Sequence, residues 1–251
     1  LALYFAPRAM SENLAAVCIV WGLALLFPLP WGEGPRSGGE GRTLLLGASL
    51  LGAATLFRLQ SGMVCLTVVL VFAVHAVRTR DWKPLLQVFG TLCVWALLFG
   101  AWDAAAWHEL PRAKYGGWFH SAFVYYDENI TKNRGAAWGV ADAGYYFRAL
   151  FSAMPGVTVA LGVAVLASFR RAPAVLFVVA AFVALHLQVP HKELRFMLPI
   201  LPVACALLGV ALSLLPPAPA RLGVALVGAA VLSSFATARN LTMGDLGSYP
   251  E

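Results

Sequence analysis

Charged residues are scarce in this sequence. Only 12% of its 251 residues are Asp, Glu, Lys or Arg, about half of what a water-soluble domain carries, whereas 60% are hydrophobic. This composition excludes an ordinary globular fold in water. The net charge of +6 does not indicate nucleic acid as a partner, because the basic residues lie mainly at the ends of apolar runs, where they set membrane topology.

Cysteine is also scarce, and its positions exclude two kinds of site. The four cysteines all fall inside apolar runs, at Cys18, Cys65, Cys93 and Cys205. They have neither the close pairing of a metal site nor the exposed spacing of a disulfide framework, so we interpret them as small core residues. His186 and His191 flank Pro190 without a third ligand at regular spacing. We therefore expect no metal site and no cofactor.

Long apolar runs are what the sequence has in abundance. A helix needs about 20 mainly apolar residues to cross the hydrocarbon of a bilayer. Eight runs approach this length, at 13–31, 43–57, 62–77, 85–102, 152–169, 173–189, 196–215 and 222–237. We predict an all-α, polytopic transmembrane helical bundle of about eight segments, forming one transmembrane domain over residues 1–251. The second and third runs are short and nearly adjacent, so either one is re-entrant or the two form a tight helical hairpin.

The positions of Lys and Arg predict the orientation of these segments. If all eight runs cross, eight basic residues share one side of the membrane, namely Arg36, Arg42, Arg78, Arg80, Lys83, Arg170, Arg171 and Arg221. The positive-inside rule makes that side cytoplasmic. Residues 103–148 and 190–195 then face the other compartment. Because the sequence starts with Leu1 in an apolar stretch, we also expect it to be a fragment that lacks an N-terminal part.

Residues 103–148 separate two apolar runs, and we predict a long non-cytoplasmic loop there. Its aromatic residues include Trp118, Tyr125, Tyr145 and Tyr146. Two interpretations stay open: an amphipathic belt on the lipid headgroups, or a platform that stacks sugar rings. Asp127 and Glu128 are adjacent, and side chains of adjacent residues point apart on a helix or strand. We interpret them as a solvated pair and not as an acid/base pair.

A second polar stretch, 190–196, lies directly between two apolar runs. Its four ionisable residues are His191, Lys192, Glu193 and Arg195. Charges at the edge of hydrocarbon are costly unless they pair or bind a ligand, so the stretch is a candidate site. One interpretation is snorkelling of Lys192 and Arg195 to the headgroups, with Glu193 neutralising one of them. The other is that both cations hold a lipid-linked phosphate, with His191 able to donate or accept a proton.

This stretch carries a family resemblance. His191-Lys192-Glu193-Leu194-Arg195-Phe196, followed by Pro199 and Pro202, resembles the His-Lys-Glu-x-Arg-Phe signature of glycosyltransferase family 22, the Alg9-like mannosyltransferases. Two weaker similarities are Arg8-Ala9-Met10-Ser11-Glu12-Asn13 and the region from Asn133 through Trp138-Gly139-Val140 to Tyr145-Tyr146-Phe147. The sequence departs from the family at Asp142-Ala143-Gly144, where Pro-Trp is usual.

The resemblance implies a membrane enzyme of the GT-C type. Such an enzyme transfers mannose from a polyprenyl- or dolichyl-phosphate-mannose donor to a lipid-linked glycan or glycosylphosphatidylinositol precursor, a glycolipid acceptor, on the non-cytoplasmic face. It would lie among the lipids of the endoplasmic reticulum membrane in a eukaryote, or of the plasma membrane in a bacterium. The family's acidic catalytic base belongs to a loop upstream of Leu1, so the catalytic residue is unknown here and we expect this fragment alone to be inactive.

For the substrate-binding residues, the resemblance and the residue chemistry together favour His191, Lys192, Glu193, Arg195, Arg58, Tyr145 and Tyr146. Lys192 and Arg195 would hold the donor phosphate, His191 and Glu193 would orient that pair or bond to a sugar hydroxyl, and Arg58 would reach the phosphate or snorkel. Two other functions stay open, a polytopic transporter or lipid flippase and a non-catalytic subunit of a glycosylation complex.

Overall fold

The computed structural model describes residues 2–27, 41–107, 117–153, 155–169, 171–213, 217–219, 221–224 and 226–228. Within these ranges every regular element is a helix, in agreement with the predicted all-α class. Contacts between residues divide the chain into two compact units. The first unit comprises Leu1–Pro28 and Pro35–Ala137, and the second comprises Leu29–Gly34 and Trp138–Glu251.

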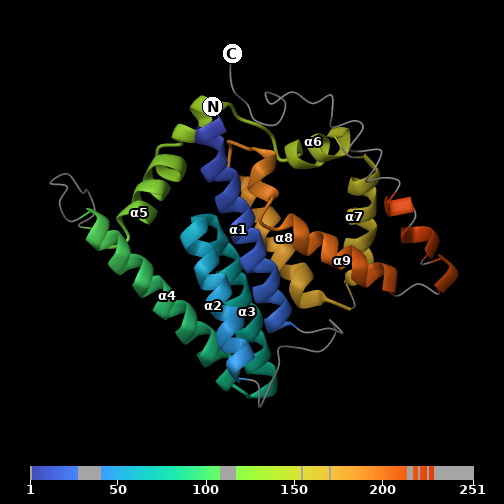
Figure 1. The fold of residues 1–251 in the computed structure, drawn as a ribbon, viewed down its shortest axis with the longest axis horizontal. Helices are drawn as coiled ribbons and strands as arrows, with labels where there is room; N and C mark the ends of the chain where they lie inside the picture. The colour runs from blue at the N-terminus through green and yellow to red at the C-terminus, as the bar shows by residue number, and fades with distance from the viewer. Residues whose placement is uncertain are drawn as a thin grey trace. The chain divides into compact units, whose positions relative to one another are not determined.

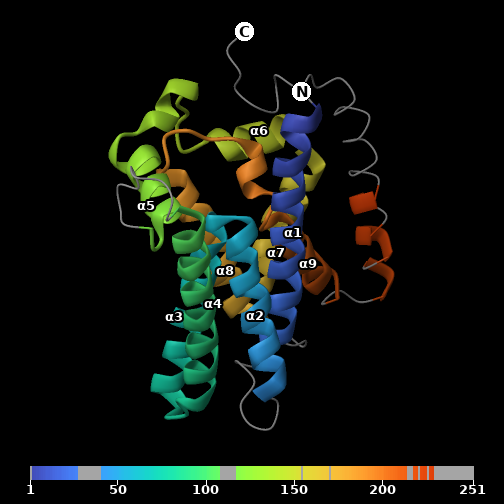
Figure 2. The same cartoon turned by 60° about the vertical axis from the view of Figure 1, so that its left-hand side comes forward.

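Four long helices build the first unit. They are α1 (Ala2–Leu26), α2 (Gly41–Phe57), α3 (Gly62–Thr79) and α4 (Lys83–Trp107). Helix α2 contacts the other three, as Figures 1 and 2 show. The apolar side chains that these helices direct at one another, among them Leu23, Leu51 and Phe72, are completely buried. Burial of one face of each helix therefore holds the unit together.

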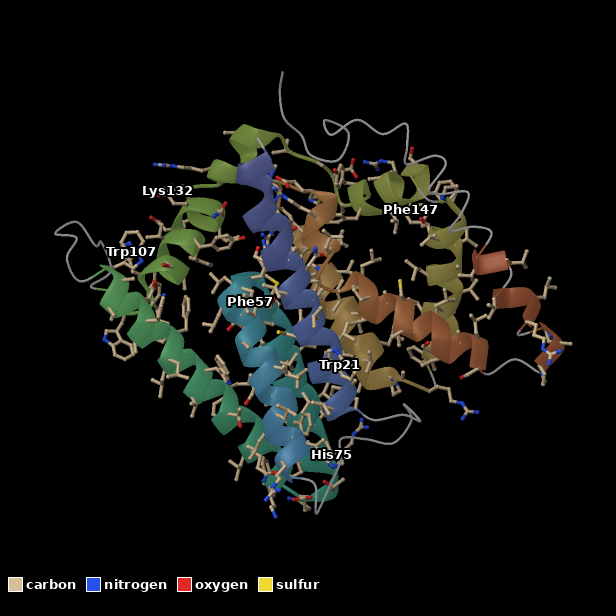
Figure 3. All side chains as sticks on the ribbon, viewed as in Figure 1. Trp21, Phe57, His75, Trp107, Lys132 and Phe147 are labelled. Carbon is tan, nitrogen blue, oxygen red and sulfur yellow. The ribbon has the colours of Figure 1, made fainter. Side chains whose placement is uncertain are left out.

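Helices α2 and α3 form an antiparallel hairpin around the short 3₁₀ turn Leu59–Ser61. The thiol of Cys65 in α3 donates a hydrogen bond to the backbone carbonyl of Leu51 in α2, 3.4 Å away, so the two helices lie against each other on either side of the turn. Figure 3 shows Phe57 near the turn and His75 near the opposite end of the hairpin. Of the two arrangements expected for these runs, the structure thus has the hairpin.

Glycine permits the closest contact between α1 and α2. A Cβ atom added to Gly22 would lie 2.8 Å from the side chain of Leu51 and 3.0 Å from the carbonyl oxygen of Gly47. A Cβ atom added to Gly47 would meet the carbonyl oxygen of Gly22 at 3.1 Å. The two backbones can approach this closely only because both positions lack a side chain, as is common where helices pack inside membranes.

Two helical stretches are long and apolar enough to cross a membrane, Leu59–Thr79 and Lys83–Trp107. Many apolar side chains of α4 are exposed, including Leu86, Leu97 and Trp102. Shorter apolar helices occupy Ser11–Leu26, Gly41–Phe57, Pro155–Ser168, Pro173–Gln188 and Leu201–Ser213. Crossings beyond the two long stretches remain a prediction.

The segment predicted as a long loop is largely helical in its described part. Helix α4 continues to Trp107, past the expected boundary at Asp103. Residues 108–116 lie outside the described ranges, and then follow α5 (His120–Tyr126) and a π-helical turn, Asp127–Thr131. A 3₁₀ turn, Arg134–Trp138, completes this part of the first unit. The sequence did not indicate these helices, because the segment is polar and aromatic and the apolar faces of the helices are short.

A buried carboxylate ties α5 to the end of α4. The Asp103 side chain is 3% exposed, and its two oxygens accept hydrogen bonds from the backbone N–H of Ser121 at 2.7 Å and from the Ser121 hydroxyl at 2.6 Å. The indole of Trp107, labelled beside α5 in Figure 3, donates to the same hydroxyl at 3.1 Å. Asp103 thus satisfies backbone and side-chain donors at the N-terminus of α5, where negative charge is favoured.

The second unit contains α6 (Tyr145–Ala153), α7 (Pro155–Ser168), α8 (Pro173–Gln188) and α9 (Leu201–Ser213). Helix α7 contacts α6, α8 and α9 (Figure 1). At the contact of α7 with α9, the buried hydroxyl of Ser168 donates to a backbone carbonyl of α9 at 3.1 Å.

Helix α9 begins later than its apolar run. The run was expected to start at Phe196, but residues Leu194–Met197 form a 3₁₀ turn and α9 starts at Leu201. Pro199 lacks the N–H that the interior of a helix needs, so the helix begins only after it. The turn keeps Arg195 off the apolar helix. Most of the expected segment 222–237 lies outside the described residues. The same is true of residues 32–39, which follow the first apolar run.

The contact of Gly22 with Gly47 predicts a specific sensitivity to volume. Gly22→Ala should lower the stability of the protein in detergent by about 1–3 kcal/mol, because the new methyl group meets the backbone of α2. Gly90→Ala in α4 is the matched control, since a Cβ there meets nothing within 4 Å. It should be neutral or slightly stabilising. Thermal unfolding followed by fluorescence measures both, and equal midpoints for the two variants would contradict the close packing.

The Asp103 contact predicts local loosening of α5. In Asp103→Ala the donors of Ser121 lose a charged acceptor, a loss of about 1.5–3 kcal/mol for each hydrogen bond. Amide hydrogen exchange should therefore accelerate across 120–126. Asp81→Ala is the control, because Asp81 accepts the backbone N–H of Lys83 at the other end of α4. Exchange in α5 should not respond to that change, and a similar response would show that Asp103 does not anchor α5.

Candidate functional site

Four of the predicted site residues lie in the second unit, directly after α8. That helix ends at Gln188, Val189 is extended, and Pro190 follows. The residue before a proline avoids helical geometry, so the chain leaves α8 at this point. Residues 190–193 then run as a short extended connection into the 3₁₀ turn Leu194–Met197. The polar signature is thus held on a tight connection between two apolar helices.

The carboxylate of Glu193 lies at the centre of this signature. Its Oε1 accepts a hydrogen bond from an η nitrogen of Arg195 at 2.8 Å, and its Oε2 contacts the ε nitrogen of the same guanidinium. Such a two-point pairing fixes the plane of an arginine side chain. Arg195 also lies over the ring of Phe196, 5.9 Å from the ring centre. Its side chain is 24% exposed, about twice as much as that of Glu193.

His191 faces an oxygen atom with each ring nitrogen. Nδ1 lies 3.0 Å from the carbonyl oxygen of Gly139, and Nε2 lies 2.8 Å from Oε1 of Glu193. A carbonyl oxygen and an ionised carboxylate can only accept hydrogen bonds. Both contacts are therefore satisfied when the imidazole carries a proton on each nitrogen.

Lys192 points into the protein and joins two stretches of backbone. Its ammonium group donates to the carbonyl oxygen of Ala141 at 2.9 Å and to that of Val189 at 2.6 Å. The backbone N–H of Ala141 donates to the carbonyl of Pro190 at 3.0 Å, which ties the same two stretches together. Lys192 is only 4% exposed. Its side chain does not extend along α8 or α9 toward a membrane surface, so snorkelling does not describe it.

The start of α6 brings two tyrosines to the same cluster. The rings of Tyr145 and Tyr146 stand edge to face, 5.5 Å apart, and α6 contacts the turn Leu194–Met197. Burial raises the pKa of the Tyr145 hydroxyl, and the negative charge of Glu193 raises it further. Burial also raises the pKa of Tyr146, which lies against the backbone of Glu193. Both hydroxyls are therefore neutral near pH 7.

Asp142 sets the position at which α6 begins. Its carboxylate accepts the backbone N–H of Gly144 at 2.6 Å and pairs with Arg148. The Arg148 guanidinium, followed by the Gly144 N–H, holds the pKa of Asp142 below its usual value. A carboxylate that accepts the N–H two residues further along closes a tight turn. The Asp142-Ala143-Gly144 departure from the family pattern is thus a turn that leads directly into α6 and its first residues, Tyr145 and Tyr146.

Arg58 lies in the first unit, in a different polar network. Its guanidinium pairs with the carboxylate of Glu12 at 2.9 Å, and Glu12 is only 2% exposed. The ε nitrogen of Arg58 donates to the side-chain oxygen of Gln60 at 3.0 Å. The side-chain amide of Gln60 in turn donates to the hydroxyl of Tyr125 at 2.7 Å. We call Glu12, Arg58, Gln60 and Tyr125 the α1–α5 network, because it joins those helices through the α2–α3 turn.

The interpretation of Asp127 and Glu128 as a solvated pair is wrong. Lys132 contacts Asp127 at 2.8 Å and Glu128 at 2.6 Å, and Arg134 also contacts Glu128 at 2.8 Å. Lys132 follows Glu128 by four residues and Asp127 by five, and the π-helical turn, with its hydrogen bond between residues five apart, brings it within reach of both carboxylates. The pKa of Lys132 is raised by hydrogen bonds to these carboxylates.

The structure thus brings six predicted site residues together in the second unit, namely His191, Lys192, Glu193, Arg195, Tyr145 and Tyr146. Sequence reasoning missed the partners Gly139, Ala141 and Glu12. The first two act through backbone carbonyls, which no residue type can signal. Glu12 had a signal, because it is an acidic residue at the start of an otherwise apolar run.

The cluster in the second unit suits an anionic ligand better than an acid/base reaction. Lys192 and Arg195 outnumber the single carboxylate of Glu193, and a protonated His191 adds a further positive charge. Glu193 is occupied by Arg195 and His191, which leaves it poorly placed to take a proton from a substrate. Among the described residues, no three His, Cys, Asp or Glu side chains gather in the way a metal site requires.

Comparison with known proteins adds three findings. A family model described as the Alg9-like mannosyltransferase family matches residues 2–243. A relative named Dol-P-Man:Man(7)GlcNAc(2)-PP-Dol alpha-1,6-mannosyltransferase, from Arabidopsis thaliana, is 29% identical over 181 residues. That match covers 67% of this chain but only 33% of the relative's length. No solved structure matches the chain significantly.

The family match covers both polar regions described above. It spans the signature at 191–196 as well as the α1–α5 network, and it covers nearly the whole chain. The apolar, all-helical structure agrees with a membrane-embedded family. The chain belongs to the Alg9-like mannosyltransferase family.

Proposed function

We propose that the intact protein transfers mannose from a dolichyl- or polyprenyl-phosphate-mannose donor to a lipid-linked glycan. The relative from Arabidopsis thaliana is named for a dolichol-linked donor and a dolichol-linked oligosaccharide acceptor. The observation that carries the proposal here is Arg195, which is held in one plane by Glu193 and is still exposed beside other cations. A phosphate with an attached sugar fits such a group.

In this proposal Arg195 contacts the donor phosphate directly. The bond from the anomeric carbon of mannose to the phosphate oxygen breaks during transfer, and negative charge accumulates on the departing phosphate. A preoriented guanidinium stabilises this charge more in the transition state than in the ground state. Lys192 also stabilises the site. Two of its N–H groups donate to backbone carbonyls, and the third can reach an anion.

The remaining parts of the reaction need groups outside this cluster. The acceptor hydroxyl must lose its proton as it attacks, and Glu193 is already bonded to Arg195 and His191. Tyr145 and Tyr146, neutral and next to Glu193, can donate hydrogen bonds to sugar hydroxyls.

The finer membrane arrangement belongs to the same proposal. Eight crossings would place 103–148 and 190–196 on the non-cytoplasmic face, where a lipid-linked sugar is reached from its headgroup side. In a eukaryote that face is the lumenal side of the endoplasmic reticulum membrane. A transporter would need ionisable groups along several crossings, whereas the cationic cluster lies on one connection between α8 and α9.

Arg195→Ala should reduce mannose transfer by at least about tenfold, since the departing phosphate loses a charged contact. The assay measures transfer of radiolabelled mannose from dolichyl-phosphate-mannose in membranes that contain the intact protein. Arg171→Ala is the matched control, because Arg171 is an exposed arginine of the same unit that lies outside the cluster, in the connection between α7 and α8. Equal activity in both variants would contradict the role of Arg195.

The Glu193→Gln variant distinguishes the orienting effect of Glu193 on Arg195 from the effect of its negative charge. It removes one negative charge from the cluster, so a purely electrostatic site would bind the donor phosphate more tightly. If Glu193 orients Arg195, the variant should instead bind more weakly, by about tenfold, because the two-point pairing is lost. Inhibition of transfer by dolichyl phosphate measures this affinity. Tighter inhibition in Glu193→Gln would show that orientation by Glu193 is not needed.

A further inference from the structure

The α1–α5 network is not used by the phosphate site. It consists of side chains in the first unit, and Arg58 is its only cation. The charge of Arg58 is compensated by Glu12, which is almost completely buried. Removing one partner of a buried ion pair leaves an uncompensated charge, which is strongly destabilising. Arg58 is therefore held firmly in place, and its neighbours take their orientation from it.

The hydrogen bonds of this network have a defined direction. A guanidinium can only donate, so the Gln60 atom that faces Arg58 must be the side-chain oxygen. The amide nitrogen of Gln60 then faces the hydroxyl of Tyr125, 2.7 Å away, and donates to it. The Tyr125 oxygen is thus an acceptor within the network, and its own proton points away from Gln60. Hydrogen bonds in such a chain strengthen one another, which makes this proton a better donor.

The end of the chain is accessible. The side chain of Tyr125 is 40% exposed, although Arg58 and Glu12 behind it are mostly buried. Trp118, on the turn that leads into α5, also presents an exposed ring. An oriented hydroxyl donor on an exposed aromatic ring suits a ligand that offers oxygen acceptors and apolar ring faces. Carbohydrate has both.

The charges near Tyr125 favour a ligand other than a phosphate. Arg58 is matched by Glu12, and in the π-helical turn after α5 the carboxylates of Asp127 and Glu128 face Lys132 and Arg134. Each of these groups of charges is balanced among the described residues, so these groups offer no surplus positive charge to an anion. The cluster around Arg195, in contrast, offers surplus positive charge. A neutral sugar is the ligand that the balanced charges favour.

We propose that Tyr125 donates a hydrogen bond to a hydroxyl or ring oxygen of the acceptor glycan. Gln60, Arg58 and Glu12 are positioning residues that orient it. This inference rests on the proposed mannosyl transfer and assigns the first unit to the neutral part of the acceptor. The role of Arg58 then differs from both expectations drawn from the sequence, since it neither contacts the phosphate nor extends to the lipid headgroups.

The test uses the intact protein purified in detergent. Tyr125→Phe keeps the ring and removes only the hydroxyl, so the KM for the lipid-linked acceptor should rise about three- to tenfold while the KM for dolichyl-phosphate-mannose stays the same. Tyr126→Phe is the matched control, because it removes the neighbouring hydroxyl, which lies outside the network. A similar rise in both variants, or no rise in Tyr125→Phe, would overturn the proposal.

A second variant tests the positioning residues. Gln60→Leu should raise the acceptor KM by a similar factor, and combining it with Tyr125→Phe should add nothing further, because both remove the same oriented donor. An additive effect would mean that Gln60 does not act through Tyr125.

Direct binding separates this inference from the proposed function. The probes are the free Man(7)GlcNAc(2) oligosaccharide and dolichyl phosphate, each titrated against the intact protein. Tyr125→Phe should weaken only oligosaccharide binding, whereas Arg195→Ala should weaken only dolichyl phosphate binding. Failure of the Arg195 arm alone would count against the proposed function. Unchanged oligosaccharide binding in Tyr125→Phe, or weakened dolichyl phosphate binding, would overturn the role of Tyr125.

Discussion

The pairing of Glu193 with Arg195 and His191 is the contact on which the cationic cluster depends. Cations crowded at the end of an apolar helix repel one another and lose hydration, so they need a counter-charge to stay folded inward. Glu193 supplies it at 2.8 Å from both partners. One carboxylate does not neutralise the cluster, however. The remaining positive charge is what makes an anionic ligand favourable at this place.

Backbone carbonyls provide further hydrogen-bond acceptors for the cluster. Lys192 bonds to the carbonyls of Ala141 and Val189, and His191 bonds to that of Gly139. These contacts connect the polar signature with the stretch that leads into α6, so the tyrosines at the start of α6 lie close to Glu193. A buried ammonium group is tolerated because its donors are satisfied. The same bonds make the site rigid, and a rigid site pays less to orient its ligand.

The two polar networks of the chain differ in charge and are suited to different parts of a glycolipid reaction. In the first unit, a buried pair of opposite charges ends in an exposed tyrosine hydroxyl. In the second unit, cations exceed the carboxylate that holds them. This difference in charge is the basis of the two proposals, a phosphate at the second unit and a neutral sugar at the first.

The sequence alone determined the all-helical class, the apolar runs and the polar stretch at 190–196, because composition and periodic hydrophobicity depend only on the order of residues. It also placed the hairpin of α2 and α3 among its alternatives. Only the tertiary structure decided that α9 starts after Pro199, that Asp127 and Glu128 share Lys132, and that Glu12 is the partner of Arg58. The pairings that involve Arg58 and Lys192 join residues some 46 to 51 positions apart, or backbone atoms that every residue has, so no local pattern could reveal them.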